Sequence, residues 1–437
     1  MKISSENIRI CFNNIPVDNF WSVPHKPDSK MHKIHAYPAK FPSIMISKAL
    51  KYSEDQGIEI KSIGDIFCGC GTTALEAKLQ NKDFWGWDIN PVATLIAKVK
   101  SKRYQKDRLI KYFDIILDAF KNKKLGTPHN YLLNERLNYW FSKDAINQLF
   151  NLLTQIKTTV PHGKYRNYFL CAFSNILKGS SRWLTKSIKP QIDPVKEPAD
   201  VETAFKKQFT FMLKAIEENK EVGASTSKTT ILTKNFLKTN FNKPFIDMLI
   251  TSPPYVTSYE YADLHQLSTL WLGYANDYRN LREGTIGSLY HKNITDEDID
   301  MLNDTGKSIV KAMDSVDKRK AKSIAKYFID MNQTIIKAFN MINPGGLAFF
   351  IIGNTRYKNV DVDNAMYLSN CMINLGFTEI EVFKRKINFK NLTPYRDKKG
   401  RFSRDPKNRE VYSHEFVIIA KKDGCSPNCC HSFFTMN

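Results

Sequence analysis

The sequence has no apolar run of the roughly 20 residues that a membrane-spanning helix needs. Residues 1–6 also lack the apolar stretch of a secretion signal. Cysteine is scarce, with 8 in 437 residues, which excludes a disulfide framework of the kind found in small secreted domains. We therefore expect a cytoplasmic protein.

The sequence also lacks cysteine and histidine residues at the spacing of a metal site. The C-terminal group of Cys425, Cys429, Cys430 and His431 contains no paired C-x2-C units of the kind that hold zinc. We predict no metal site, and a flexible polar tail at 423–437.

Acidic residues are outnumbered by basic ones, 44 against 65, which gives a net charge of +21 and a pI near 9.4. A surplus of this size favours a polyanionic partner, either nucleic acid or an anionic membrane surface. Without a membrane segment, nucleic acid is the better interpretation. An apolar content of 42% and a charged content of 25% are those of a folded protein, and the length predicts two or three domains.

The N-terminal part of the chain has the pattern of a nucleotide-binding βαβ unit. A strand at 58–67 leads into the turn Cys-Gly-Cys-Gly-Thr-Thr at 68–73, and a helix from residue 74 precedes a second strand at 84–87 that ends at Asp88. Glycines let the backbone approach a ligand, and a carboxylate after the second strand can accept hydrogen bonds from both hydroxyls of a ribose.

This turn lacks two features of phosphate-binding loops. The third glycine of the dinucleotide pattern is absent, and no G-K-[ST] ending follows. Asp88 nevertheless follows Gly71 at close to the expected spacing of about 20 residues. The turn therefore predicts a nucleoside-bearing cofactor held without a tight pyrophosphate contact, with Thr72 or Thr73 as the cap of the helix.

Between about 104 and 225 the pattern changes to amphipathic helices. A basic, hydroxyl-rich run at 178–190 within this region contains Arg182, Lys186 and Lys189. The run is compatible with a solvated loop and with a surface that contacts DNA phosphates, because Lys, Arg, Ser and Thr make most contacts to the DNA backbone.

Strands and helices alternate again after residue 226. The strands expected at 245–250 and 347–352 are apolar enough to be buried on both faces of a sheet. Further elements are expected at 230–233, 324–342, 379–383 and 415–420. A cation-rich loop at 384–412 favours contact with phosphate or a solvated charged surface. Its candidate residues are Arg396, Lys398, Lys399, Arg401 and Arg404.

One buried strand ends in Thr251-Ser252-Pro253-Pro254-Tyr255. Two successive prolines cannot continue a sheet ladder, because neither has an N–H and each has a fixed φ. They can hold a hydroxyl, a carbonyl and an aromatic ring at the carboxyl end of a strand, which is where open α/β sheets bind ligands. Without other motifs, a strand that ends in a proline turn is the simpler interpretation.

Taken together, these motifs resemble those of the amino-group DNA methyltransferases that use S-adenosylmethionine. The stretch from Asp65 to Thr73 is similar to that family's D-P-F-x-G-x-G-T-T cofactor motif, with Ile66 in place of the proline, and residues 251–255 are similar to its T-S-P-P-Y catalytic motif. The segment His-Ala-Tyr-Pro-Ala-Lys-Phe-Pro at 35–42 resembles the element that closes over the cofactor.

The resemblance implies an α/β fold with a Rossmann-like S-adenosylmethionine-dependent methyltransferase sheet, helices on both faces and a mostly helical insertion domain. The catalytic domain is expected in two parts, 25–103 and 226–422, and the insertion at 104–225 is the candidate DNA-recognition domain. The order of the motifs and the position of the insertion are those of the family's α arrangement.

The implied cofactor-binding residues come from the two N-terminal motifs and from the ends of the following strands. Asn235 stands where the family often has an acidic residue, and would form a hydrogen bond to the cofactor's adenine. The full set is Tyr37, Lys40, Phe41, Asp65, Phe67, Gly69, Gly71, Thr72, Thr73, Asp88, Asn235 and Thr251.

The catalytic motif also fits methylation of an exocyclic amine on physical grounds. Such an amine is a poor nucleophile because its lone pair is delocalised, and acceptors on both amino hydrogens favour the pyramidal geometry that attack requires. The Ser252 hydroxyl and the Pro253 carbonyl are the candidate acceptors, and Pro254 adds rigidity. Tyr255 offers a face for stacking on a base swung out of the duplex.

Serine before Pro-Pro-Tyr is typical, within the resembled family, of cytosine-N4 enzymes, whereas aspartate or asparagine is typical of adenine-N6 enzymes. The resemblance thus implies a cytosine-N4 methyltransferase for double-stranded DNA, located near the nucleoid of a prokaryotic cell and partnered with a restriction endonuclease. Adenine-N6 methylation, methylation of RNA amines and a non-catalytic DNA-binding protein with this fold remain open.

Overall fold

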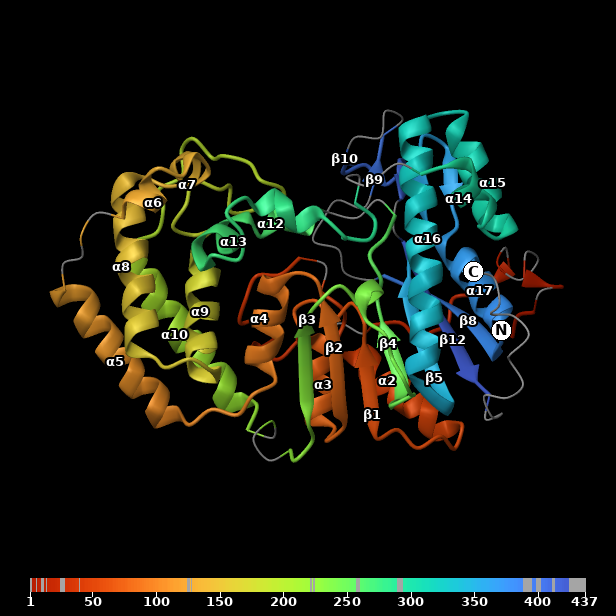
Figure 1. The fold of residues 1–437 in the computed structure, drawn as a ribbon, viewed down its shortest axis with the longest axis horizontal. Helices are drawn as coiled ribbons and strands as arrows, with labels where there is room; N and C mark the ends of the chain where they lie inside the picture. Colours follow the sequence, from red (N-terminus) through yellow and green to blue (C-terminus); the bar gives the residue numbers. More distant parts are fainter. Residues whose placement is uncertain are drawn as a thin grey trace.

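The structure is a computed structural model of the chain. It describes residues 2–423 apart from 5, 9–11, 13, 24–27, 39, 124–125, 127, 221, 223–224, 257–259, 289–293, 388–394, 398–401 and 411–412. Figure 1 shows two lobes, one built of helices and the other of a sheet covered by helices.

Seven strands of the described chain form the central sheet, in the order β3-β2-β1-β4-β5-β12-β8. Neighbouring strands are parallel except β12, which is antiparallel to both β5 and β8. The strands are β1 (Ser62–Asp65), β2 (Asp83–Asp88), β3 (Thr229–Thr233), β4 (Ile246–Thr251), β5 (Ile342–Ile352), β8 (Phe377–Lys386) and β12 (His414–Lys422). Because β12 is reversed, its first residues lie at the same edge as the last residues of its neighbours; we call this the carboxyl edge.

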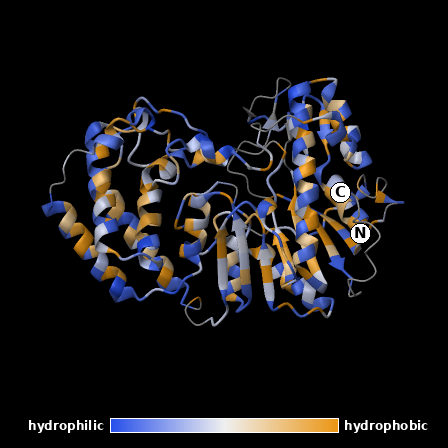
Figure 2. Ribbon diagram, viewed as in Figure 1, coloured by the Kyte–Doolittle hydropathy of each residue, from blue (hydrophilic) through white to orange (hydrophobic). Residues whose placement is uncertain are grey.

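Both faces of the sheet are covered, which explains why its strands are apolar without alternation. In β5, Phe349 and Ile351 pack on one face with α2 (Ile44–Asp55) and α3 (Thr72–Leu79), while Phe350 and Ile352 pack on the other with α16 (Lys318–Met341) and α17 (Asn364–Leu375). Figure 2 shows the hydrophobic residues concentrated on these strands and on the inner sides of the helices. The predicted α/β fold with helices on both faces is confirmed.

The N-terminal residues extend the lobe that contains the sheet beyond the β8 edge. Lys2 forms an isolated bridge with Glu381, and Val17 forms another with Lys384. Trp21 is buried against the face that carries α2. The segment therefore covers part of an edge strand that would otherwise present unpaired backbone groups.

The helical lobe shares a hydrophobic core with helices of the lobe that contains the sheet. These include α4 (Pro91–Lys100) and α13 (Gln266–Leu272). The Trp271 ring on α13 stacks on the Tyr131 ring, with centroids 4.7 Å apart. The Gln266 side-chain oxygen accepts hydrogen bonds from Arg136 and Trp140. The helices of the insertion are α5 (Lys106–Asn122), α6 (His129–Leu132), α7 (Glu135–Trp140), α8 (Lys143–Thr159), α9 (Lys164–Ile176) and α10 (Val201–Glu218).

The remaining helices and strands of the described chain are mostly short. They are η1 (Lys30–Lys33), η2 (Phe236–Lys238), α12 (Tyr261–Leu264), η3 (Tyr278–Arg282), α14 (Asp296–Asp300), α15 (Asp304–Asp314), β6 (Thr355–Tyr357), β7 (Val360–Val362), β9 (Tyr395–Arg396), β10 (Phe402–Ser403) and β11 (Arg409–Glu410). None of the described helices is both long and apolar enough to cross a membrane.

One detail of the sequence prediction is wrong. Neither Thr72 nor Thr73 caps helix α3, whose N-cap is Gly71 without a side-chain hydrogen bond. The Thr73 hydroxyl is used elsewhere, because it donates to the Asp65 carboxylate on β1.

Candidate active site

Asp65, the last residue of β1, joins the two sequence motifs. One of its carboxylate oxygens accepts a hydrogen bond of 2.7 Å from the Thr251 hydroxyl at the end of β4, and the other accepts one of 2.7 Å from the Thr73 hydroxyl on α3. The Phe67 N–H also donates to this carboxylate. Burial raises the pKa of Asp65 to about 6, although all three hydrogen bonds lower it. The cofactor turn and the catalytic strand therefore meet at one buried side chain.

The glycines of the turn meet two different requirements. Gly71 has a φ of +76°, and a Cβ there would lie 2.5 Å from the Cβ of Ala97 on α4, so the turn packs directly on that helix. Gly69 has a φ of +48°, and its hypothetical Cβ would face the Tyr37 hydroxyl at 3.7 Å. Gly71 is thus needed for packing, whereas Gly69 leaves its backbone accessible beneath the Tyr37 ring.

Asp88, at the end of β2, is positioned by backbone donors. One carboxylate oxygen accepts from the Gly69 N–H and the other from the Asn90 N–H, each over 2.8 Å. Burial raises the pKa of Asp88 to about 6, and these two hydrogen bonds oppose the shift. Each carboxylate oxygen has lone pairs left for a ribose hydroxyl.

The predicted closing segment lies over the turn, as far as its residues are described. The Tyr37 ring stacks on the Tyr261 ring of α12, with centroids 5.9 Å apart, and burial beside Asp88 raises the pKa of its hydroxyl well above the usual range. The Lys40 ammonium donates to the His32 carbonyl over 3.0 Å, and Phe41 packs against the core under α2. Burial lowers the pKa of Lys40, and the nearby Lys100 lowers it further.

His265, which the sequence did not single out, belongs to this site. Its Nδ1 accepts a hydrogen bond of 2.9 Å from the side-chain amide of Asn90, and its ring lies 5.0 Å from the Tyr37 ring between centroids. Its buried Nε2 has no hydrogen-bond partner among the described residues. Burial lowers the pKa of His265 to about 3, and the neighbouring His35 lowers it further, so the ring is neutral at physiological pH. It lies between α12 and α13, far from either motif in sequence, where no spacing pattern indicates it.

Asn235 lies at the end of the third strand, but its side chain is already used. Its Oδ1 accepts from the Leu237 N–H over 2.9 Å, which caps η2, and its Nδ2 donates to the Gly284 carbonyl over 3.3 Å. A contact with adenine stays a prediction, and it would have to share these groups.

The catalytic motif begins at the last residue of β4. Thr251 and Pro253 are buried and Ser252 is half-buried. Among the described residues, no hydrogen bond engages the Ser252 hydroxyl or the Pro253 carbonyl. Within the described part of the chain, both acceptors therefore remain available to a substrate.

The residues present fit S-adenosylmethionine. The Gly69 backbone, the Asp88 carboxylate and the Tyr37 ring lie together at the carboxyl edge. Beside them, Nε2 of His265 is a further buried polar atom, with no hydrogen-bond partner among the described residues. The described residues contain no group of three or more His, Cys, Asp or Glu side chains that could hold a metal ion, and the cysteines of the tail lie outside those residues.

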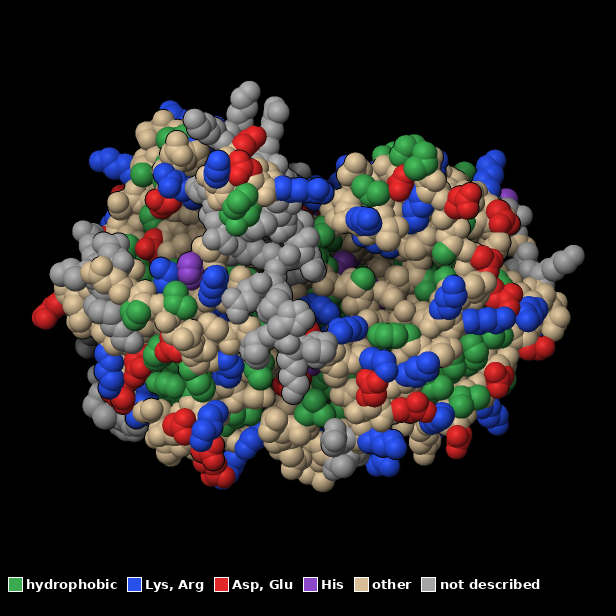
Figure 3. Space-filling view, turned by 180° about the vertical axis from the view of Figure 1, so that it is seen from behind, with side chains coloured by type: hydrophobic (Ala, Val, Ile, Leu, Met, Phe, Trp, Pro, Cys, Tyr) green, Lys and Arg blue, Asp and Glu red, His purple; other side chains and the backbone are tan. Residues whose placement is uncertain are grey.

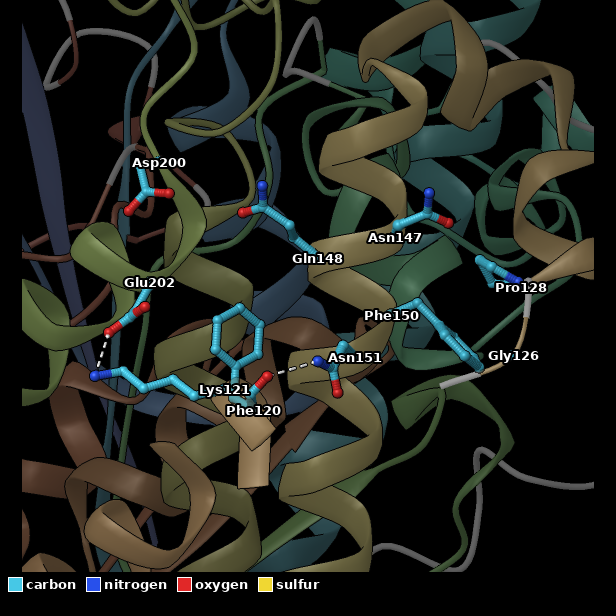
Figure 4. Close-up of a pocket in the computed structure, with 10 residues that line it drawn as sticks. All are labelled: Phe120, Lys121, Gly126, Pro128, Asn147, Gln148, Phe150, Asn151, Asp200 and Glu202. Atoms are coloured by element: carbon cyan, nitrogen blue, oxygen red, sulfur yellow. Dashed lines mark hydrogen bonds and ion pairs between the residues drawn. The ribbon is translucent and has the colours of Figure 1, made fainter. Parts of the chain in front are cut away.

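Two cavities of about 630 Å³ lie elsewhere. The one in Figure 4 is formed by α5, α8 and the start of α10, and its lining is polar and apolar in equal parts, with an ion pair between Glu202 and Lys121. The other lies around α2 and the residues that precede β1. Neither contains a predicted site residue, and ligands of open α/β sheets bind outside the carboxyl ends of the strands. We therefore place the site at the carboxyl edge.

The predicted DNA-binding residues differ in their surroundings. Lys186 and Lys189 are exposed in the loop after α9, whereas Arg182 donates to the carbonyls of Asn138 and Tyr139 at the end of α7. Arg404 is exposed in the described part of the basic loop. For Arg396 only the backbone, in β9, is described. Lys398, Lys399 and Arg401 lie outside the described residues. Figure 3 shows the molecule from behind the view of Figure 1. On the face in view, basic and acidic side chains are interspersed rather than gathered into one patch.

The mostly parallel sheet with helices on both faces is the Rossmann-like fold of methyltransferases, and the methyltransferases that this chain is similar to use S-adenosylmethionine. Residues 3–99 match the family model for DNA methylases that act on N6 or N4. The type II methyltransferase M.MvaI of Kocuria varians is 23% identical over 82% of this chain and 84% of its own length. These findings support methyltransferase activity on DNA and a distant homology to the type II methyltransferases, and neither finding distinguishes N4 from N6.

More limited similarities were also found. The type II methyltransferase M.AvaI of Nostoc sp. is 28% identical over 31% of this chain and 32% of its own length. The solved structure of the rRNA methyltransferase AviRa from Streptomyces viridochromogenes aligns with 91% of this chain and 94% of its own, at 8% identity and a TM-score of 0.30.

Proposed function

We propose that this protein transfers a methyl group from S-adenosylmethionine to the exocyclic N4 amine of cytosine in double-stranded DNA. The observation that carries the proposal is the hydrogen bond between Thr251 and Asp65. The Ser-Pro-Pro-Tyr motif thus follows a strand end that is bonded to the strand before the glycine-rich turn. This contact supports a reaction between a methyl donor on the turn and an amine at the motif.

In this proposal the chain acts mainly by positioning the two reactants. The cofactor, when bound, supplies a methyl group already activated on a sulfonium. Asp88 accepts hydrogen bonds from its ribose hydroxyls, and Tyr37 covers the nucleoside. Holding both reactants in one geometry replaces a bimolecular encounter with an intramolecular step.

Ser252 and Pro253 act on the amine. The serine hydroxyl and the proline carbonyl each accept one amino hydrogen, which favours the pyramidal nitrogen and stabilises the positive charge that develops on it. The Thr251 anchor and the two prolines fix both acceptors, so little reorganisation is needed during the reaction. The amine becomes acidic only once it carries the methyl group, so a strong base is not required beforehand.

The choice of cytosine rests on the serine at position 252, since the resembled adenine-N6 enzymes carry aspartate or asparagine there. The type II name of the relatives supports a role in protecting DNA beside a cognate restriction endonuclease. The net charge of +21 supports a polyanionic substrate, with the insertion and the basic loop as the proposed DNA contacts.

Mass spectrometry of nucleosides tests the proposal. The protein is incubated with labelled S-adenosylmethionine and either double-stranded DNA or RNA, and the nucleic acid is then digested. Labelled N4-methylcytosine from DNA is the expected product. Labelled N6-methyladenine would instead select adenine as the base, label in RNA alone would contradict a DNA substrate, and cofactor binding without transfer would indicate a non-catalytic DNA-binding protein.

A further inference from the structure

The aromatic residue of the catalytic motif makes a specific contact across the carboxyl edge. The Tyr255 hydroxyl donates a hydrogen bond of 2.7 Å to Oε1 of Glu415 on β12. The contact crosses β5, which lies between β4 and β12 in the sheet. It is possible because β12 runs in reverse, so that Glu415, near its start, lies at the carboxyl edge.

Gly353 provides the space that the Tyr255 ring occupies. It follows β5 directly, and a Cβ at this position would lie 3.0 Å from Cε2 of the ring and 3.3 Å from Cζ and from the hydroxyl. These three atoms of the Tyr255 side chain are the nearest neighbours of a Cβ added at Gly353. The end of β5 therefore packs against one part of the Tyr255 side chain, and the Asn364 side chain donates to the Gly353 carbonyl from the other side.

Arg385, at the end of β8, completes the network. Its guanidinium forms an ion pair with Oε2 of Glu415, and the two side chains are 4% and 17% exposed. A buried guanidinium needs a charged partner, because the cost of removing it from water is otherwise several kcal/mol. Oε1 of the Glu415 carboxylate thus accepts from the Tyr255 hydroxyl while Oε2 faces the Arg385 guanidinium, and a charged acceptor makes a stronger hydrogen bond than a neutral one.

We propose that Glu415 and Arg385 are positioning residues, which hold the Tyr255 ring at a fixed orientation as one wall of the pocket for the target base. The inference rests on the proposed function, because it assigns the ring to a nucleobase. Neither residue touches the reacting atoms. Their effect reaches the reaction through the orientation of the stacking face, on which the position of the extruded base depends.

Three substitutions test the inference by different routes. Tyr255→Phe removes only the hydroxyl, and Glu415→Gln keeps an acceptor but removes the charge. Gly353→Ala leaves every polar group in place and displaces the ring by a few tenths of an ångström. Glu379→Gln on β8, which removes an exposed ion pair with Lys421, is the matched control.

The measurements are kcat, KM for DNA, the Kd of S-adenosylmethionine, and the fluorescence of 2-aminopurine at the target position of a DNA duplex. We expect each of the three variants to lower kcat by about tenfold and to reduce the fluorescence rise on DNA binding, with the cofactor Kd and the control unchanged. We also expect Tyr255→Phe combined with Glu415→Gln to be no worse than the more affected single variant, because both act on the same hydrogen bond between residues 255 and 415.

Two results would overturn the inference while leaving the proposed function intact. The first is wild-type kcat and fluorescence in Tyr255→Phe and Gly353→Ala. The second is a double variant whose loss equals the product of the two single losses. If Glu415→Gln does not fold, the other two variants decide the outcome. A wild-type protein that methylates no DNA would contradict the proposed function. The 2-aminopurine fluorescence would then decide the inference: a smaller rise in the three variants would support it, and an unchanged rise would contradict it.

Discussion

The Thr251 hydroxyl donates a hydrogen bond of 2.7 Å to the buried carboxylate of Asp65, and this bond connects the two halves of the site. Thr251 directly precedes the proposed amine acceptors, and Asp65 lies three residues before Cys68, the first residue of the cofactor turn. The same carboxylate accepts from Thr73 at the start of α3. The relative position of methyl donor and methyl acceptor therefore depends on one side chain in the interior of the sheet.

Replacing Thr251 with valine tests this connection. Valine keeps the shape of threonine but removes one of the two donors to Oδ1 of Asp65, the other being the Phe67 N–H, and loss of such a buried hydrogen bond costs about 1–3 kcal/mol. We expect a lower melting temperature, weaker S-adenosylmethionine binding and a lower kcat. Thr334→Val is the control, because it also removes a buried hydroxyl, which donates to the Asp330 carbonyl on α16. It is expected to affect stability alone, and a Thr251→Val variant with wild-type cofactor Kd and kcat would contradict the connection.

The two glycines of the cofactor turn predict different defects when each is replaced by alanine. Gly71→Ala combines a positive φ with a Cβ 2.5 Å from Ala97, so it should destabilise the fold by more than about 2 kcal/mol. Gly69→Ala has a positive φ but ordinary contact distances, so it should cost only about 1 kcal/mol while its methyl group obstructs the cofactor. Thermal unfolding and isothermal titration with S-adenosylmethionine measure the two effects. Equal loss of stability in both variants would contradict this distinction.

The buried carboxyl groups predict a pH dependence of cofactor binding. Burial raises the pKa of Asp88 to about 6, so the group takes up a proton as the pH falls through 6 and loses its capacity to accept from both ribose hydroxyls. We expect the Kd of S-adenosylmethionine to rise by up to about tenfold for each pH unit below 6.

Protonation of Asp88 does not raise the Kd by unfolding the protein. The folded-state pKa lies above the ordinary value of 3.8, so protonation of Asp88 between pH 6 and 4 favours the folded state. Asp88→Asn, which cannot titrate, should bind weakly at pH 7 and lose little further affinity at pH 5. The same steep pH dependence in this variant would show that another group is responsible.

The sheet and its two motifs follow from the sequence because each is encoded locally. Apolar runs bounded by glycine or proline indicate the strands, and the turn at 68–73 and the motif at 251–255 lie at strand ends, where α/β sheets bind ligands. These local patterns are enough to place Asp65 and Ser252 at one edge of a sheet. The predicted capping role of Thr72 or Thr73 is wrong, because helix α3 begins at Thr72 with Gly71 as its N-cap. The Thr73 hydroxyl inside the helix donates to the buried Asp65 instead.

The partners of the site do not follow from the sequence. His265 meets Asn90 across 175 residues of chain, and Glu415 meets Tyr255 across 160. Such contacts depend on strand order and on the reversal of β12, which no local pattern encodes. A single histidine or glutamate outside any motif does not indicate a functional role in the sequence, and its role becomes visible only when the fold brings it to the carboxyl edge.

Substitution of Ser252 by alanine tests the central claim most directly. The change removes one proposed acceptor of the amine and no hydrogen bond within the described part of the protein, so folding and cofactor binding should be unaffected. Single-turnover methylation of DNA and the Kd of S-adenosylmethionine are measured on the same preparation. The proposed role predicts a methylation rate lower by about 10²-fold or more, as for loss of one preorganised polar contact in the transition state, with the Kd nearly unchanged. A wild-type rate, or a parallel loss of rate and cofactor affinity, would contradict the role assigned to this strand end.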